Sequence, residues 1–207
     1  MVKLLGGRVA SAVIGLFMLA VGSSAAAQNI GTVANPAATL VTPAVASTTA
    51  PSSSSSIAAE ATWLYKAGWP LYALVDKFAT SATLDEQTNC LATAVYFEAR
   101  GESVEGQLAV ARVVMNRASS GRYPPDWCSV VKQPAQFSFV RHGEFPYADT
   151  NSDAWKKAEA VAQLAAANVV PSVGPDVLWY HATYVAPSWG HRLNMAEKIG
   201  LHIFYRT

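Results

Sequence analysis

Apolar residues recur at the three- and four-residue spacing of an α-helix in three stretches of the C-terminal part of the chain. The first stretch follows Thr83 and Glu86, whose spacing fits a capping box, and it runs to about residue 99. The second covers about residues 103–117 and the third about residues 152–168. We therefore expect three helices to form most of a folded domain that begins at residue 81.

Loops and short strands complete this predicted domain, which spans residues 81–207. Residues 119–151 are rich in glycine and proline, which favours loops. Residues 177–181 and 202–205 have the composition of short strands. The pattern predicts an α+β fold, namely a mostly helical domain with a small β element.

Two further segments precede this domain. Residues 28–58 carry no charge and consist mainly of Ala, Ser, Thr, Pro and Val, which predicts a disordered linker. In residues 59–80 the apolar side chains after Pro70 stand on one face of a short helix. We expect this partly helical segment to pack on the domain; contact with a membrane or a partner is the alternative.

The N-terminus has the features of a secretory signal peptide over residues 1–27. Lys3 and Arg8 precede an apolar run at residues 9–21, and Ala25, Ala26 and Ala27 offer a small-residue cleavage site. A spanning helix needs roughly 20 apolar residues, and this run is shorter. We expect an exported protein of the periplasm or cell wall with no membrane span after cleavage; an uncleaved anchor is the alternative.

The net charge of the chain indicates whether a nucleic acid is among its partners. The full chain carries +1, and removal of residues 1–27 takes away two basic residues and no acidic one, which leaves −1. Nucleic-acid-binding domains usually carry a clear basic excess. We therefore expect no nucleic-acid partner.

The cysteines and histidines predict a disulfide and no metal site. Cys90 and Cys128 would enter an oxidising compartment, where a pair can bridge; two separate buried thiols are the alternative. His181, His191 and His202 are ten and eleven residues apart, which matches no common zinc-ligand spacing. We expect no metal and no cofactor.

Glu98 stands on a helical face that is otherwise apolar. Burial of a carboxylate without a partner raises its pKa, and an acid that is still protonated near neutral pH can protonate a leaving oxygen. A buried ion pair with Arg100, Arg112 or Arg117 is the structural alternative, and spacing alone favours it. Glu102 lies close by and is expected to line the same cleft.

Several blocks of the chain, over about residues 86–206, resemble the bacterial cell-wall hydrolase family of the spore cortex-lytic enzymes. These blocks are Glu98-Ala99-Arg100-Gly101-Glu102, Gly106-Gln107, Asn116-Arg117, Gln136-Phe137-Ser138-Phe139, Tyr180-His181, Pro187-Ser188-Trp189 and Gly200-Leu201-His202-Ile203-Phe204. Phe97 departs from the family pattern, because many relatives have a small residue there. His181 also departs, because others have Asn.

The resemblance implies a lysozyme-like fold with a substrate cleft and cleavage between N-acetylmuramic acid and N-acetylglucosamine in peptidoglycan. The family's catalytic acid is the first Glu of the Glu-x-Arg-Gly-Glu block, which corresponds to Glu98. In a lytic transglycosylase this one residue serves as acid and then as base, and the product is a 1,6-anhydro sugar. A hydrolase needs a second carboxylate, for which the candidates are Glu102, Glu144, Asp149 and Asp153.

The same resemblance leads us to expect sugar contacts from a set of polar and aromatic residues: Glu102, Gln136, Phe137, Ser138, Tyr180, His181 and Trp189. Aromatic residues are more often part of a core, which is the alternative for Phe137 and Trp189. The competing functions are a hydrolytic muramidase, a non-catalytic peptidoglycan-binding protein and a zinc amidase. An unidentified regulatory protein could act on residues 28–80.

Overall fold

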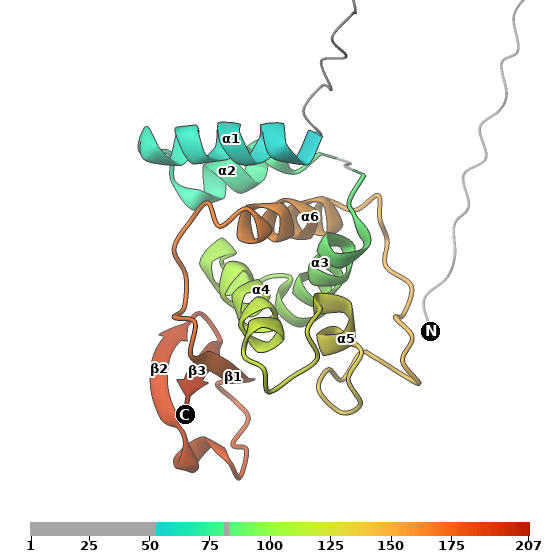
Figure 1. The fold of residues 1–207 in the computed structure, drawn as a ribbon, viewed down its shortest axis with the longest axis vertical. Helices are drawn as coiled ribbons and strands as arrows, with labels where there is room; N and C mark the ends of the chain where they lie inside the picture. The colour runs from blue at the N-terminus through green and yellow to red at the C-terminus, as the bar shows by residue number, and fades with distance from the viewer. Residues whose placement is uncertain (1–52, 81–82) are drawn as a thin grey trace, which may run out of the picture. The chain divides into compact units, whose positions relative to one another are not determined.

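The computed structural model describes residues 53–80 and 83–207 (Figure 1). The expected signal peptide and most of the expected linker lie outside these residues. The helices are α1 (Ser53–Lys66), α2 (Leu71–Phe78), α3 (Glu86–Ala99), α4 (Val104–Ser119), α5 (Trp127–Val131), α6 (Asp153–Ala166) and the 3-10 helix η1 (Gly190–Arg192). The strands are β1 (Val177–Ala182), β2 (Asn194–Ile199) and β3 (His202–Arg206). The predicted α+β class, with a mostly helical domain and a small β element, is confirmed.

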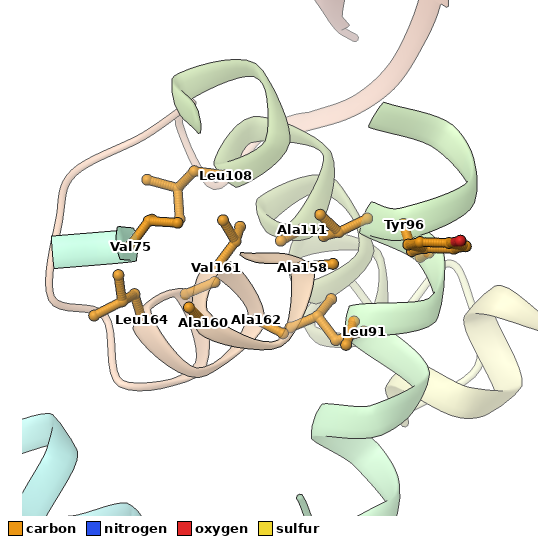
Figure 2. Close-up of a cluster of buried hydrophobic side chains, with 14 of the residues drawn as sticks. Val75, Leu91, Tyr96, Leu108, Ala111, Ala158, Ala160, Val161, Ala162 and Leu164 are labelled. Atoms are coloured by element: carbon orange, nitrogen blue, oxygen red, sulfur yellow. The ribbon is translucent and has the colours of Figure 1, made fainter. Parts of the chain in front are cut away.

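The main core lies between the helices. α6 packs against α3 and α4 on one side and against α2 and α1 on the other (Figure 1). Leucines from different helices meet there, and alanines of α6 fill the space between the larger side chains (Figure 2). Leu74 of α2, Leu91 of α3 and Leu108 of α4 are all buried in this one cluster. Burial of each such side chain stabilises the fold by about 1.5–3 kcal/mol.

The sheet packs on α4 through a second, smaller core. Its strand order is β1-β3-β2, and both pairs are antiparallel. Phe204 of the central strand is fully buried against Val110 and Val113 of α4 and Val177 of β1. The antiparallel register places Ala182 opposite His202 and His181 opposite Ile203. This register brings the C-terminal end of β1 beside the first residue of β3.

The structure corrects two expectations. Asp85 caps α3, because its Oδ1 accepts a hydrogen bond of 2.9 Å from the Thr88 N–H, so Thr83 and Glu86 form no capping box. α1 begins at Ser53, so residues 53–58 belong to a helix and not to a linker. The apolar face of α2 is buried in the main core, so this part of residues 59–80 packs on the domain and does not face a membrane or a partner.

Strand β2 was not expected from the sequence. It lies at an edge of the sheet and most of its side chains are exposed, so its sequence needs no apolar alternation. No helix within the described part of the chain is long and apolar enough to cross a membrane.

Candidate active site

A cavity of about 370 Å³ lies where the C-terminal end of α3 meets α4, the loop after α5, and strands β1 and β3. Glu98 and Arg117 line it from the helices, and Tyr180 and His202 line it from the strands. Two larger cavities, of about 600 and 540 Å³, lie against α1, and a third of about 410 Å³ lies beside the starts of α3 and α5. None of the three is lined by a carboxyl group whose pKa is raised, so the cavity at Glu98 is the best candidate for acid–base chemistry.

The local sequence places Glu98 at the last turn of α3. Ala99 is the last helical residue, Arg100 is extended, and Gly101 turns the chain with φ of +93°. α4 then begins after Ser103, whose hydroxyl caps it by accepting a hydrogen bond from the Gly106 N–H. This sharp corner leaves the Glu98 side chain at the cavity and not between the two helices.

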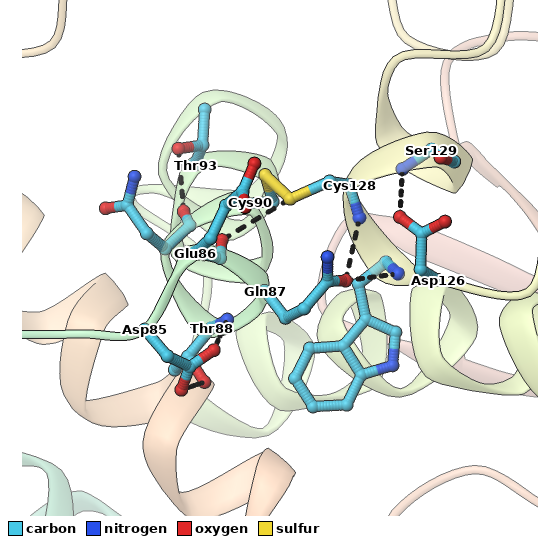
Figure 3. The surroundings of a disulfide bond; sticks show 11 residues. Asp85, Glu86, Gln87, Thr88, Cys90, Thr93, Asp126, Cys128 and Ser129 are labelled. Carbon is cyan, nitrogen blue, oxygen red and sulfur yellow. Dashed lines mark hydrogen bonds between the residues drawn. A yellow bond between two sulfur atoms is a disulfide. The ribbon is translucent and has the colours of Figure 1, made fainter.

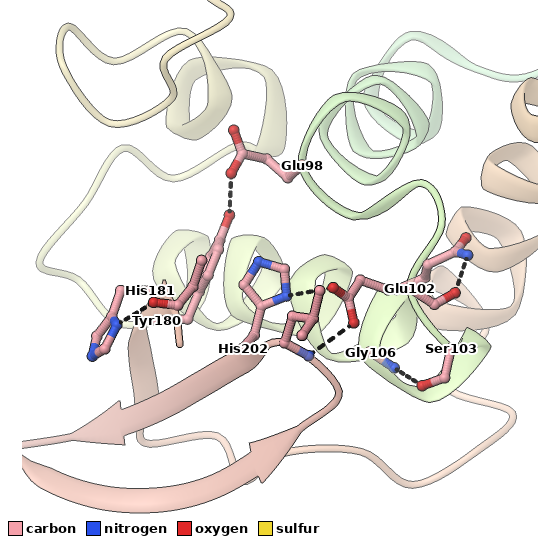
Figure 4. A network of polar contacts seen from close by, with 10 residues as sticks. Glu98, Glu102, Ser103, Gly106, Tyr180, His181 and His202 are labelled. Carbon is pink, nitrogen blue, oxygen red and sulfur yellow. Dashed lines mark hydrogen bonds and ion pairs between the residues drawn. The ribbon is translucent and has the colours of Figure 1, made fainter. Parts of the chain in front are cut away.

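The Glu98 carboxyl group is half-buried and has a raised pKa. The Tyr180 hydroxyl donates a hydrogen bond of 3.3 Å to its Oε2 (Figure 4). Burial raises the pKa of Glu98, while the Tyr180 hydrogen bond and the charge of Arg117 act in the opposite direction. The net effect is a raised pKa, so Glu98 stays protonated at a higher pH than an exposed glutamate does.

The alternative of a structural ion pair finds no support at Glu98. Among the described residues, Glu98 forms no salt bridge. Arg100 is exposed and lies over the Tyr96 ring, and Arg112 donates to the Asn168 side chain. Arg117 is buried, and its Nε donates to the Leu178 carbonyl at 2.8 Å, so it anchors β1.

Tyr180 remains a hydrogen-bond donor under all ordinary conditions. Burial raises the pKa of its phenol well above the usual range, and the charge of Glu98 raises it further. Its hydroxyl therefore keeps its proton and points it at Glu98. This residue was expected to contact sugar, and the structure also gives it a direct contact with the candidate acid.

Glu102 lies on the other side of the corner and does not line the cavity, which corrects the expectation for it. Its Oε2 accepts a hydrogen bond of 3.0 Å from the Leu201 N–H, and its Oε1 lies 3.9 Å from Nδ1 of His202 (Figure 4). Gly200 has φ of +56°, and a Cβ there would overlap the Glu102 carboxylate. The Glu102 carboxylate is therefore engaged in contacts within the protein, where it holds the β2–β3 turn.

The loop after α5 supplies two of the expected polar residues and corrects the expected aromatic one. Gln136 and Ser138 are exposed and line the cavity. Phe137 points into the core with 2% of its surface exposed, so it cannot stack on a sugar. Phe97, the residue that departs from the family pattern, stacks on Phe139 with 4.9 Å between ring centroids and so supports this loop beside Glu98.

His181 lines the cavity, and Trp189 supports it from behind. The Nε2 of His181 lies 2.9 Å from the Tyr205 hydroxyl, and its Nδ1 lies 2.8 Å from the Ala182 carbonyl. Trp189 packs edge-on against the His181 ring and does not line the cavity, so the expectation of a stacking platform at Trp189 is corrected. The sequence reasoning missed exposed Tyr184, which lines the cavity from the turn after β1 and carries no helical or strand pattern.

The cavity contains one carboxyl group from the described residues, that of Glu98. The four candidates for a second catalytic acid (Glu102, Glu144, Asp149 and Asp153) are not among the residues that line it. Within residues 53–80 and 83–207, no group of three or more His, Cys, Asp or Glu side chains could hold a metal ion. The arrangement is therefore suited to proton transfer by one half-buried acid.

Cys90 and Cys128 form a disulfide that ties α5 to α3 (Figure 3). Gln87 strengthens the same junction, because its side-chain oxygen accepts hydrogen bonds from the N–H groups of Trp127 and Cys128 at 2.8 and 3.2 Å. Gln136 and Ser138 follow α5 closely in the chain. The crosslink therefore fixes the start of the cavity loop to the helix that carries Glu98.

The fold and this cavity define a domain suited to acid–base chemistry, and comparison with known proteins gives its family. The model of the cell wall hydrolase family matches residues 101–205, which is half of the chain, and this protein belongs to that family. The matched segment includes every cavity residue named above except Phe97 and Glu98, which lie just before it.

Individual relatives are similar over the same region. The chain is 35% identical to the spore cortex-lytic enzyme of Oceanobacillus iheyensis over 114 residues, which cover 55% of this chain and 39% of that protein. It is 38% identical to the spore cortex-lytic enzyme of Bacillus subtilis over 119 residues, which cover 55% of this chain and 35% of that protein. The matched part thus spans less than half the length of these relatives.

One solved structure of a catalytic domain resembles this chain. It is the catalytic domain of the germination-specific lytic transglycosylase SleB from Bacillus anthracis. Its sequence is 32% identical, the TM-score is 0.49, and the match covers 60% of this chain and 98% of that domain.

Proposed function

We propose that this chain is an exported lytic transglycosylase that cleaves peptidoglycan glycan strands between N-acetylmuramic acid and N-acetylglucosamine. The observation that carries the proposal is Glu98, a half-buried acid with a raised pKa in a cavity that holds no second carboxylate from the described residues. The names of the relatives, which include spore cortex-lytic enzymes and a lytic transglycosylase, support this class of substrate and reaction.

In the proposed reaction Glu98 donates its proton to the glycosidic oxygen as the bond from C1 to that oxygen breaks and positive charge develops on the sugar ring. The C6 hydroxyl of muramic acid then attacks C1 and loses its proton, which gives a 1,6-anhydro product. One carboxylate is sufficient for this chemistry, because the deprotonated Glu98 can accept that proton. Gln136, Ser138, Tyr180 and His181 are the proposed sugar contacts.

A hydrolytic muramidase is the second candidate, and a specific observation weighs against it. Such an enzyme uses a second carboxylate at about 5–10 Å from the first. None of the described acidic residues other than Glu98 lines the cavity. A zinc amidase and a non-catalytic wall-binding protein have no particular feature of the described residues in their favour.

We propose the periplasm or the cell wall as the location. The predicted signal peptide and the disulfide between Cys90 and Cys128 are both typical of exported proteins.

Release of soluble fragments from purified sacculi tests the proposed function. We expect Glu98→Gln to lower the rate by about 10²–10⁴-fold, because it removes the general acid and keeps the shape of the side chain. Glu144→Gln is the matched control, since Glu144 is exposed and does not line the cavity; it is expected to retain wild-type activity. Equal rates for Glu98→Gln and the wild type would refute the assignment of the acid.

A further inference from the structure

His202 is a buried titratable residue that the mechanism above does not use. It is the first residue of β3, its exposed fraction is 6%, and it lines the same cavity as Glu98. Its Nδ1 is one of the few buried polar atoms of the described residues that have no hydrogen-bond partner. A buried, unpartnered polar group costs stability, so its retention in a cavity points to a function.

A carboxylate lies close to this imidazole without forming a hydrogen bond to it. Oε1 of Glu102 lies 3.9 Å from Nδ1, and the Glu102 side chain is itself held by the Leu201 N–H. A carboxylate on this side favours the tautomer with the proton on Nδ1, which leaves the Nε2 lone pair free. Figure 4 shows the His202 ring between Glu102 on one side and Tyr180 with Glu98 on the other.

The ring is fixed in this position by its neighbours. Tyr180 packs edge-on against it with 5.4 Å between ring centroids, and Phe204 lies on the same strand at 6.2 Å. The β2–β3 turn that carries Leu201 cannot move away without losing the hydrogen bond to Glu102. The acceptor nitrogen is therefore preorganised in the cavity that also contains the candidate acid.

We propose that His202 is the general base of the reaction and that Glu102 is its positioning residue. This inference rests on the proposed function and changes its second step. The C6 hydroxyl of muramic acid loses its proton to Nε2 of His202, while its oxygen forms the new bond to C1. The bond from C1 to the leaving oxygen breaks, and that oxygen takes the proton of Glu98. His202 ends with the proton of the C6 hydroxyl and Glu98 ends without its own, and proton exchange with solvent restores both groups.

The electrostatics of the cavity suit this division of roles. The pKa of His202 is lowered overall, mainly by burial. The charge of His181 also lowers it, and the nearby Glu102 carboxylate acts in the opposite direction. The imidazole is therefore neutral at the pH of a cell wall and able to accept a proton. The groups that face it or share its cavity are Glu102, Tyr180, His181, Glu98 and Arg117, while Glu197 and Lys198 of the neighbouring strand β2 are exposed.

The two mechanisms predict different pH profiles. If Glu98 acts alone as acid and then base, the rate rises as pH falls and reaches a plateau. If His202 is the base, the profile is a bell, because protonation of His202 removes the base at low pH and ionisation of Glu98 removes the acid at high pH. The acid limb therefore belongs to His202 and the alkaline limb to Glu98.

Glu102→Gln gives the sharpest test. Its side-chain oxygen can still accept the Leu201 N–H, so the turn is expected to stay in place. Its amide would donate to Nδ1, which places the proton on Nε2 and blocks the base; we expect a loss of about tenfold or more in kcat. Loss of the carboxylate also lowers the pKa of His202, so the acid limb of the residual activity moves to lower pH. Glu105→Gln is the matched control, because Glu105 is an exposed acid at the start of α4.

His202→Gln is the second variant, for which we expect a rate loss of about 10²–10⁴-fold and disappearance of the acid limb. Thermal unfolding of each variant checks that it is folded. Wild-type kcat and an unchanged acid limb in Glu102→Gln would overturn this proposal while Glu98-dependent cleavage still stood. Absence of glycan cleavage by the wild type would overturn the proposed function and this inference together.

Discussion

Reduction of the disulfide should destabilise the domain by an amount that follows from its place in the chain. Cys90 and Cys128 are separated by 38 residues. The loop-closure entropy for a loop of this length corresponds to about 4 kcal/mol at 25 °C. Domains are usually stable by only about 5–15 kcal/mol, so this is a large part of the total. For a chain of this size the melting temperature should fall by about 8–16 °C.

The assay is unfolding in urea with and without a thiol reductant, followed by tryptophan fluorescence. We expect the reductant to lower the free energy of unfolding of the wild type and to leave a Cys90→Ala/Cys128→Ala variant unchanged. Activity on sacculi should fall as well, because the crosslink holds α5 and the loop that carries Gln136 and Ser138. A reductant effect below about 1 kcal/mol, or two thiols that react on alkylation of the unreduced, denatured protein, would refute this reasoning.

Other predictions concern the acid and its surroundings. Tyr180→Phe removes a hydrogen bond that lowers the pKa of Glu98, so the alkaline limb of the pH–rate profile should move to higher pH; a limb that stays in place would contradict the assigned contact. Glu98→Gln should be at least as stable as the wild type at neutral pH. Because its pKa is raised, the folded state binds the Glu98 proton more tightly than the unfolded state does, so the wild type loses stability as pH rises through that pKa. The difference in free energy of unfolding between the two proteins should therefore shrink in acid. Urea unfolding at several pH values would measure it. Gly200→Ala should destabilise the fold by about 1–2 kcal/mol or more, because φ is +56° and the new methyl group would meet Glu102; an unchanged melting temperature would argue against the described turn.

The helical part of the fold could be predicted from the sequence because helical spacing is a strong local signal. Leu91, Ala94 and Val95 repeat at that spacing, and the helix they predicted is α3. Strand β2 has no such signal, since an edge strand with mostly exposed side chains need not alternate. The capping-box pattern predicts Thr83 as the cap of α3, but Asp85 directly precedes the helix and accepts the hydrogen bond from the Thr88 N–H.

The site was predictable in part. Glu98 stood out because a carboxylate on an apolar face is unusual, and the surrounding motif singled it out. The roles of Glu102 and Phe137 depended on which way each side chain points, and this is set by tertiary contacts with the Leu201 turn and with the core. The pairing of Glu102 with His202 joins residues far apart in the chain, so neither spacing nor composition could indicate it.

The source of the oxygen at the new chain end tests the central claim most directly. Sacculi can be digested with the wild-type protein in water enriched in heavy oxygen, and the products separated and weighed by mass spectrometry. A transglycosylase driven by Glu98 must give 1,6-anhydro fragments, each lighter by one water than the hydrolysis product and free of the heavy isotope. Reducing-end muramic acid that carries the heavy isotope would show that water attacks, and it would contradict the mechanism proposed for this cavity.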